Sequence, residues 1–340
     1  MNILIISDCF YPETKSISRH IYDLIKKMDS KKIKVSFYFS SNKKNKKFFN
    51  DNYRLKNVNY NPVFLDNLKK KKFIFRGIHE FKSPYLIWKK IKHSDIKFDK
   101  ILVFSPSIFF GLIFRNLKVK FNCKIILIIR DIFPNWVMQK NIFLWLNPFY
   151  LFALIISKLQ FYFCDVIATQ SKNDFKIFKK KYPNKKVMTL YNWITPKKIK
   201  IKIKKNNINK FIFGGTIGPA QNWDNIIRLI VELKKNKALF KFHFIGDGKN
   251  LNYLKEKIQI LNENVLFIKP KPEEEYIKFL TKMDIGVISL DQTILFNNIP
   301  GKFFSYLETN LFILSDTAYG QDISKIINNY KVGLTNNKSN

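Results

Sequence analysis

Cysteine, glycine, proline and acidic residues are scarce in this chain of 340 residues. It contains only 3 Cys, 11 Gly and 12 Pro, and 25 Asp and Glu stand against 61 Lys and Arg, which gives a formal net charge of +36. So few cysteines exclude a disulfide-rich fold, and so little glycine and proline excludes a collagen-like chain. Because 46% of the residues are apolar, including 34 Phe, the chain is not disordered. Its length fits about two domains.

The three cysteines, Cys9, Cys123 and Cys164, lie far apart in or beside apolar runs. They form no CxxC pair and no Cys/His cluster with the spacing of metal ligands. We therefore expect three buried free thiols in a reducing compartment. The N-terminal segment MNILIISDCFYPE has no charged region before its apolar stretch, so it predicts a first strand rather than a signal peptide.

No long hydrophobic run interrupts the alternation of the chain. The most apolar segment, 141–163, includes Asn147, Ser157, Lys158 and Gln160, and its longest clean run, 148–156, is too short to span a bilayer. We expect a buried helix here, with a helix lying in the membrane interface as the alternative. In either case the chain is not expected to cross the membrane.

Arginine is also scarce among the basic residues, and sites that grip phosphates or bases through bidentate contacts favour Arg over Lys. The excess of Lys, together with much Asn, Ile and Phe, is explained by AT-rich coding and predicts a solvated basic surface. Such a surface attracts anionic membranes or ligands through a non-specific field. Nucleic-acid binding has no motif behind it, so no nucleic-acid partner is expected. The few arginines are Arg19, Arg54, Arg76, Arg115, Arg130 and Arg228.

Short apolar runs alternate with stretches of helical period, which is typical of parallel α/β sheets. The class we expect is two doubly wound, Rossmann-like domains facing each other across a cleft: 1–195, a Lys-rich linker at 196–209, and 210–340. Residues 41–98 carry no pattern that we can assign. Expected strands are 2–7, 34–40, 100–105, 124–130, 165–170, 186–192, 210–216, 241–247, 264–270, 285–290 and 311–316. Expected helices are 16–29, 109–117, 149–163, 173–181, 222–236, 250–261, 273–282, 301–309 and 320–329.

Two glycine pairs follow expected strands of the second half. GGTIGPAQNWD (214–224) suits an anion held by backbone N–H groups at a helix N-terminus, although its spacing matches neither GxGxxG nor the P-loop. By itself, IGDGKN (245–250) is explained by a tight turn between a strand and a helix. In PGKFFSYLET (300–309), Lys302 opposes the helix dipole and is explained by a neighbouring phosphate, or else is one more surface lysine. Ser305 and Glu308 share a face of this helix.

The order of motifs from 210 to 334 resembles the nucleotide-sugar half of retaining family 4 glycosyltransferases with the GT-B fold. It is most similar to the branch of bacterial N-acetyl-fucosamine transferases of surface-polysaccharide assembly. The matching segments are FIFGGTIGPAQNWDN, FHFIGDGKNLNYL, NVLFIKPKPEEEYIKFLTKMDIGVISL, IPGKFFSYLETNLFILSDT and VGL. MNILIISDCFYPE, IIRDIFPNW, DVIATQSKNDFKIF and LYNWI follow the family's order in the first half. Family members continue with further helices, so this chain is expected to be short or truncated at its C-terminus.

The resemblance implies transfer of a hexosyl or N-acetylhexosaminyl group from a UDP- or GDP-linked donor to a lipid-linked glycan acceptor, with no metal or other cofactor. The protein would work in the cytoplasm, peripherally on the inner face of an anionic cytoplasmic membrane. Catalytic residues would be Asp131 and Lys302. From the residues alone, Asp131 equally starts an Asx turn. Donor-binding residues would be Gly215, Thr216, Gly218, Gln221, Lys302, Ser305 and Glu308, and acceptor-binding residues Asp8, Glu13 and Arg19.

Several positions depart from the family pattern. The Arg and Lys that many members use at the donor loop fall on Thr216 and Gln221, and Ser305 replaces the acidic residue that binds the donor ribose. We expect Glu308 to reach the same hydroxyls from the next turn. Ser305 and Asn310 favour an inactive paralogue or glycan-binding scaffold as the alternative function, and a nucleotide-sugar epimerase of the same fold is a closer one. His20 is expected to be packed or solvated rather than catalytic.

Overall fold

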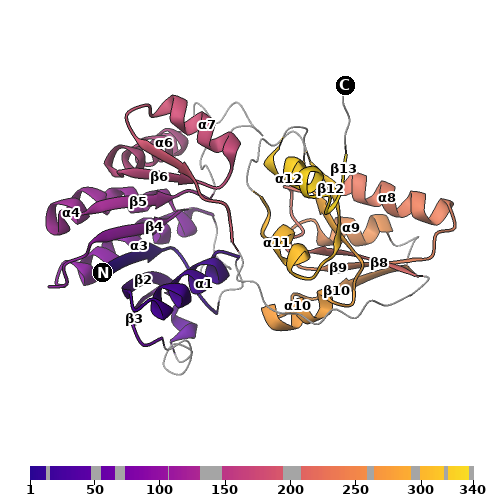
Figure 1. Cartoon of the computed structure of the whole chain (residues 1–340), viewed down its shortest axis with the longest axis horizontal. Coiled ribbons are helices and arrows are strands. Elements are labelled where there is room, and N and C mark those ends of the chain that lie inside the picture. The colour runs from indigo at the N-terminus through magenta and orange to yellow at the C-terminus, as the bar shows by residue number, and fades with distance from the viewer. Residues whose placement is uncertain are drawn as a thin grey trace. The chain divides into compact units, whose positions relative to one another are not determined.

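The computed structural model describes residues 1–12, 16–46, 55–65, 73–105, 107–130, 148–193, 208–258, 264–291, 299–317 and 321–336. The chain divides into two compact units, Met1–Asn192 and Trp193–Asn340, which are described separately below (Figure 1). Each is a parallel sheet with helices on its faces, and this confirms the expected class of two doubly wound α/β domains. The expected linker at 196–209 lies outside the described residues except for Ile208 and Asn209.

The first unit is built on a seven-stranded sheet of order β3-β2-β1-β4-β5-β6-β7. Its strands are β1 (Asn2–Ser7), β2 (Lys34–Asn42), β3 (Val58–Leu65), β4 (Lys100–Phe104), β5 (Lys124–Ile128), β6 (Val166–Thr169) and β7 (Lys186–Thr189). Its helices are α1 (Ser16–Ser30), η1 (Lys43–Asn45), α3 (Phe73–Ile91), η2 (Ile108–Phe110), α4 (Gly111–Phe121), α6 (Pro148–Phe163) and α7 (Lys172–Lys181).

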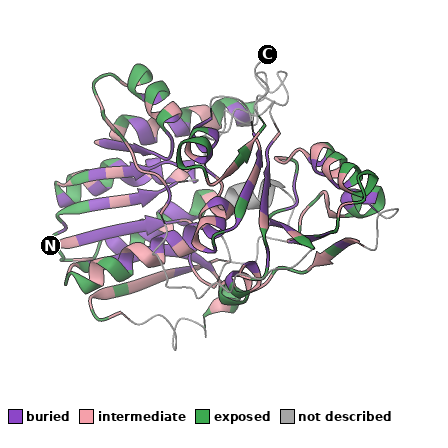
Figure 2. Ribbon diagram, turned by 45° about the vertical axis from the view of Figure 1, so that its right-hand side comes forward, coloured by how far each residue is buried: buried purple, intermediate pink, exposed green. Residues whose placement is uncertain are grey.

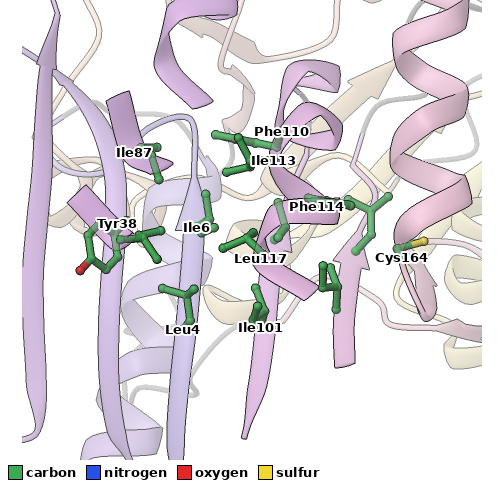
Figure 3. Close-up of a cluster of buried hydrophobic side chains, with 14 of the residues drawn as sticks. Leu4, Ile6, Tyr38, Ile87, Ile101, Phe110, Ile113, Phe114, Leu117 and Cys164 are labelled. Atoms are coloured by element: carbon green, nitrogen blue, oxygen red, sulfur yellow. The ribbon is translucent and has the colours of Figure 1, made fainter. Parts of the chain in front are cut away.

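The two faces of this sheet are covered differently. Leu4 and Ile6 of β1 point into a core shared by α3, α4, α6 and α7, of which Figure 3 shows Phe114 and Leu117 from α4. Phe10 packs edge-on against Phe37, which belongs to the other set of alternating side chains and faces the α1 side. All four helices α3, α4, α6 and α7 therefore lie on one face, as right-handed crossovers in this strand order require.

The second unit is built on a six-stranded sheet of order β10-β9-β8-β11-β12-β13. Its strands are β8 (Asn209–Gly214), β9 (Phe240–Ile245), β10 (Val265–Ile268), β11 (Ile285–Ser289), β12 (Phe312–Asp316) and β13 (Gly333–Thr335). Its helices are α8 (Trp223–Lys235), α9 (Leu251–Ile258), α10 (Glu273–Leu280), α11 (Gly301–Glu308) and α12 (Asp322–Tyr330). Stacked phenylalanines on β8, β9 and β10 form much of its core, including Phe242, Phe244 and Phe267.

The helix expected at 149–163 is buried on one side and exposed on the other. Ile156 and Phe161 are buried, whereas Ile155 and Tyr162 are 60% and 71% exposed. The composition could not indicate this, because an apolar helix does not specify how much of its circumference is covered. Figure 2 shows the buried residues along the strands and exposed residues on the outer sides of helices. Among the described residues, no helix has the length and apolar content needed to cross a membrane.

The three cysteines form no disulfide, as expected, with Cys9 and Cys164 buried and Cys123 half-buried. Burial raises the pKa of the Cys164 thiol to about 12, so this thiol stays protonated at neutral pH and is unreactive.

Candidate functional site

The first glycine loop begins where β8 ends, at Gly214. Gly215 has φ +117°, a conformation that side-chain-bearing residues rarely adopt, and its N–H donates to the Ile245 carbonyl at 2.8 Å. Two residues on, the Ile217 N–H donates to the Asp247 carbonyl at 2.9 Å. Gly215 and Thr216 are exposed while Ile217 is buried. The loop therefore leaves the sheet, is fixed along one side, and exposes Gly215 and Thr216 to a ligand.

The second glycine pair supports the first loop and is more than a turn. A Cβ on Gly246 would lie 1.8 Å from the Gly215 carbonyl oxygen, and one on Gly248 would lie 2.1 Å from the Ile217 carbonyl oxygen. Real Cβ contacts are never so short. Only glycine at these two positions allows the main chains of the two loops to touch.

Gln221 and Trp223 hold the far end of the first loop. The Gly218 N–H donates to the Gln221 side-chain oxygen at 3.0 Å, and the Trp223 indole N–H donates to the Gly218 carbonyl at 2.9 Å. The side chain of Asn222 caps α8 by accepting from the Asn225 N–H at 3.2 Å. Gln221 was expected to bind the donor directly. The hydrogen bond from Gly218 to its side-chain oxygen orients the loop, and its donor contact stays a prediction.

Lys302 projects from the first turn of α11 toward this loop. Its ammonium lies 3.3 Å from the centroid of the Phe213 ring, and a Cβ on Gly215 would lie 3.8 Å from the ammonium nitrogen. Lys302 is half-buried, and burial lowers the pKa of its ammonium well below the usual value. Among the described residues, no carboxylate lies within ion-pair distance of it.

Tyr306 is a residue that sequence reasoning missed. Its hydroxyl accepts from the Gly214 N–H at 3.0 Å and lies 3.3 Å from the Ile212 carbonyl, to which it donates. Strand β8 pairs with β11 only at Phe211 and Ile212, so the Tyr306 hydroxyl binds the main chain of β8 where this pairing ends. Tyr306 is fully buried, and a Cβ on Gly286 would meet its ring at 2.4 Å. Gly286, an isolated glycine within an expected strand, was the available signal for this close approach.

The other expected donor residues occupy the same helix as Lys302. Ser305 is buried, and its carbonyl accepts from the Thr309 hydroxyl at 2.8 Å, while Glu308 is half-buried in the last turn. Asn310 has φ +54°, the left-handed conformation in which a helix commonly ends in glycine and which Asn also tolerates. The replacement of glycine at Asn310 therefore preserves the path of the chain.

Two of the expected acceptor residues, Asp8 and Arg19, lie at the carboxyl edge of the first unit's sheet. Asp8 follows β1, and its Oδ1 is buried with no hydrogen-bond partner among the described residues, as are the hydroxyls of Ser18 and Ser107. Arg19 lies 3.9 Å from Asp23 in a weak ion pair. Ser18 and Ser107, which no sequence pattern indicated, lie at the same polar edge. Glu13 and Asp131 lie outside the described residues.

His20 is packed, as expected. It is 3% exposed, and its Nδ1 lies 3.3 Å from a guanidinium nitrogen of Arg130, which donates to it. Burial, with smaller effects of Arg130 and Arg19, lowers the pKa of His20 to about 3. The imidazole is therefore neutral at physiological pH and accepts from Arg130, which follows β5.

The sequence comparisons point to glycosyl transfer. Residues 195–291 match the family described as Glycosyl transferases group 1. A protein of Pseudomonas aeruginosa, "Probable glycosyltransferase WbjE", is 22% identical over 281 residues, which cover 78% of this chain and 68% of that protein.

The solved structures agree in fold. WaaG, a glycosyltransferase involved in lipopolysaccharide biosynthesis, is similar with a TM-score of 0.65 at 11% identity, covering 98% of this chain and 85% of that one. The α,α-trehalose 6-phosphate synthase of Burkholderia multivorans is similar with a TM-score of 0.65 at 9% identity, covering 97% and 90%. The chain thus has the GT-B fold. Together with the family match, this supports a GT-B glycosyltransferase.

Proposed function

We propose that the protein is a retaining glycosyltransferase of surface-polysaccharide synthesis. It transfers a hexosyl or N-acetylhexosaminyl group from a UDP- or GDP-linked donor to a lipid-linked glycan at the inner face of an anionic cytoplasmic membrane. The family match and the names of WbjE and WaaG support glycosyl transfer. The single observation that carries the donor site is the position of the Lys302 ammonium beside Gly215.

Burial makes the charged form of Lys302 less favourable, and an anion bound beside it would offset that cost. The missing side chain of Gly215 lets a diphosphate approach the main chain and the ammonium together. The first turn of α11, where no side chain caps the amides, adds N–H groups for the same anion. When the glycosidic bond to the donor breaks, negative charge develops on the departing nucleotide diphosphate. Lys302 and these amides stabilise it in place.

The acceptor is assigned to the polar edge of the first unit. A glycan carries many hydroxyls, and Asp8, Ser18 and Ser107 offer buried polar atoms that await a partner. Arg19, Glu13 and Asp131 complete the acceptor and sugar contacts that the resemblance implies. It also implies that the donor phosphate accepts the acceptor's proton, and that the reaction needs no metal ion.

Ser305 and Glu308 divide the role of the missing ribose-binding carboxylate. Ser305 offers a hydroxyl and Glu308, one turn further along α11, offers charge. We expect Glu308→Gln to weaken nucleotide binding by about tenfold and Ser305→Ala by less, as measured by titration calorimetry. Unchanged affinity in Glu308→Gln would remove this residue from the site.

A calorimetric and thermal-shift screen of UDP-, GDP- and dTDP-sugars tests the donor site. A donor that binds the folded protein raises its apparent stability, and Lys302→Met should weaken that donor by about tenfold or more. The control Lys249→Met removes an exposed lysine of the neighbouring loop and should change affinity by less than about twofold. If no nucleotide sugar binds, or if both variants behave alike, the proposed donor site is wrong.

The alternative, an inactive paralogue or glycan-binding scaffold, is favoured by the absent carboxylate at Ser305. Incubation with radiolabelled nucleotide sugars and extracted membrane lipids separates the two functions. The proposed enzyme incorporates label into lipid, and incorporation falls in Lys302→Met. A scaffold binds the glycan and incorporates none. An epimerase would change the sugar without any lipid present.

A further inference from the structure

The outer face of α6 is apolar and exposed. Leu151, Phe152, Ile155 and Tyr162 are 46%, 47%, 60% and 71% exposed. Their spacing places them on one side of the helix together with the exposed Lys158. The opposite side, which carries Ile156, Gln160 and Phe161, is buried against the first unit's core. We call this exposed strip, Leu151, Phe152, Ile155, Lys158 and Tyr162, the α6 outer face.

The helices beside α6 extend this surface. Gly111 of α4 packs against Gln160, and Phe178 of α7 lies 5.2 Å from Phe161 between ring centroids, so α4 and α7 flank α6 on the same face of the sheet. Val119 of α4 and Ile177 of α7 are exposed. In contrast, none of the described side chains of α1, on the opposite face of the sheet, is an exposed large hydrophobic residue.

The charges on α4, α6 and α7 have one sign. Asp174 is the sole acidic residue of these three helices, and it is buried. Asp165, which follows α6, is paired with Lys118 at 2.6 Å. The exposed basic residues are Arg115, Lys120, Lys158, Lys172, Lys176, Lys179, Lys180 and Lys181. The surface is therefore an apolar strip within a cationic field.

We infer that the α6 outer face docks on an anionic lipid bilayer, with its apolar side chains entering the interface and the flanking lysines facing lipid phosphates. A helix lying in a membrane interface needs this combination of apolar strip and basic flanks. A second copy of the chain fits less well, because pairing this face with itself would oppose like charges. The inference rests on the proposed function for the membrane-bound acceptor and adds the surface that brings the enzyme to it.

The test is vesicle flotation of the full chain without donor or acceptor. Vesicles contain phosphatidylcholine alone or phosphatidylcholine with phosphatidylglycerol. We compare the wild type with a triple variant, Leu151→Ser, Phe152→Ser and Ile155→Ser. The matched control is Val231→Ser, Leu239→Ser and Phe312→Ser, which replaces second-unit residues of similar exposure, 43%, 61% and 44%. Thermal unfolding of each variant verifies that it folds.

The wild type and the control should float with anionic vesicles, and the triple variant should bind about tenfold less or weaker still. Lys158→Glu should reduce binding more than Lys257→Glu, a reversal on the exposed side of α9. Equal flotation of triple variant and wild type would overturn the inference, as would equal binding to neutral vesicles. A dimer seen by light scattering that only the triple variant dissociates would make a second copy the occupant.

Nucleotide-sugar affinity of the same proteins separates the two proposals. The triple variant should keep the wild-type donor affinity, because its substitutions lie in the first unit. Donor binding without vesicle binding in the wild type would refute the docking face alone. Vesicle binding without any donor binding would refute the proposed function and leave the docking face standing.

Discussion

The two units build the carboxyl edges of their sheets in different ways. In the second unit, main chain packs on main chain, since the carbonyls of Gly215 and Ile217 touch Gly246 and Gly248. In the first unit, side chains gather at the edge, and one of them, Asp8, has a buried oxygen without a described partner. The comparison teaches that a rigid backbone cradle needs few side-chain identities, whereas an edge of polar side chains is tuned residue by residue.

The charge of the chain is divided in the same uneven way. At the second unit's loops, the ammonium of Lys302 lies beside Gly215 and the Phe213 ring. On the first unit, the lysines of α7 and their neighbours form a broad basic surface. The excess of +36 therefore says little about the proposed donor site. The excess charge bears on what the first unit's surface binds, more than on the chemistry of that unit.

The largest expected effect comes from breaking the main-chain contact of the second unit. Gly246→Ala places a Cβ 1.8 Å from a carbonyl oxygen and should lower the free energy of unfolding by about 3 kcal/mol or more. In the control, Gly218→Ala, the Cβ meets nothing closer than Thr216 Cγ2 at 3.5 Å, and the loss should stay below about 1 kcal/mol. Urea unfolding measures both. Equal losses would show that the loops do not depend on this contact.

The first unit should respond to acid through a side chain. The pKa of His20 is about 3 in the folded state, against an ordinary value of 6.5 in an unfolded chain, so the unfolded chain binds the extra proton between these values. The free energy of unfolding should therefore fall by about 1.4 kcal/mol per pH unit as pH drops from 6.5 toward 3. His20→Asn should flatten this slope, and His93→Asn, at an exposed histidine, should keep it. A slope that persists in His20→Asn would assign it to other groups.

Tyr306→Phe should have an intermediate effect. It leaves the buried Gly214 N–H without its 3.0 Å acceptor, which costs about 1–3 kcal/mol. Tyr253→Phe removes an exposed hydrogen bond to Asp224 and should cost less than about 0.5 kcal/mol. Hydrogen exchange at the Gly214 amide offers a second readout, since it should quicken in the first variant alone.

The smallest expected effect is a pH dependence of nucleotide binding. Because the pKa of Lys302 lies well below its usual value, the free protein loses this charge as pH rises, whereas a bound anion favours the protonated form. Affinity for UDP or GDP should then fall with rising pH, by about tenfold per unit at most. Lys302→Arg keeps its charge and should give a flatter profile by calorimetry. Identical profiles would separate the pH dependence from Lys302.

Most strands of this fold could be predicted from the sequence, including the edge strands β7 and β10, but the edge strands β3 and β13 could not. Central strands such as β1 and β5 hold unbroken apolar runs, residues 3–6 and 125–128, because neighbours cover both of their faces. At the edge of the first sheet, β3 carries Asn59, Asn61 and Pro62 and is only partly buried. Helix α3 contains Pro84, which breaks its helical pattern. The last strand, β13, is too short to give any pattern.

The site was predictable where local rules carry it. A lysine in the first turn of a helix opposes the helix dipole, and this rule indicates Lys302 from the sequence alone. The structure places its ammonium beside Gly215. The roles assigned to it and to Glu308 remain predictions. Tyr306 and the support from Gly246 depend on contacts between segments far apart in the chain, which no local pattern encodes.

The contact between the two glycine loops has a consequence for how such a protein can diverge. The shape of the first glycine loop depends on contacts between main-chain atoms, and main-chain atoms are the same whatever the surrounding side chains are. In a lineage whose codons drift toward lysine, asparagine and phenylalanine, neighbouring side chains such as that of Thr216 can be replaced while the packing of the two glycine loops is kept. The same drift cannot replace Gly246 or Gly248, because a methyl group at either position would collide with the first glycine loop.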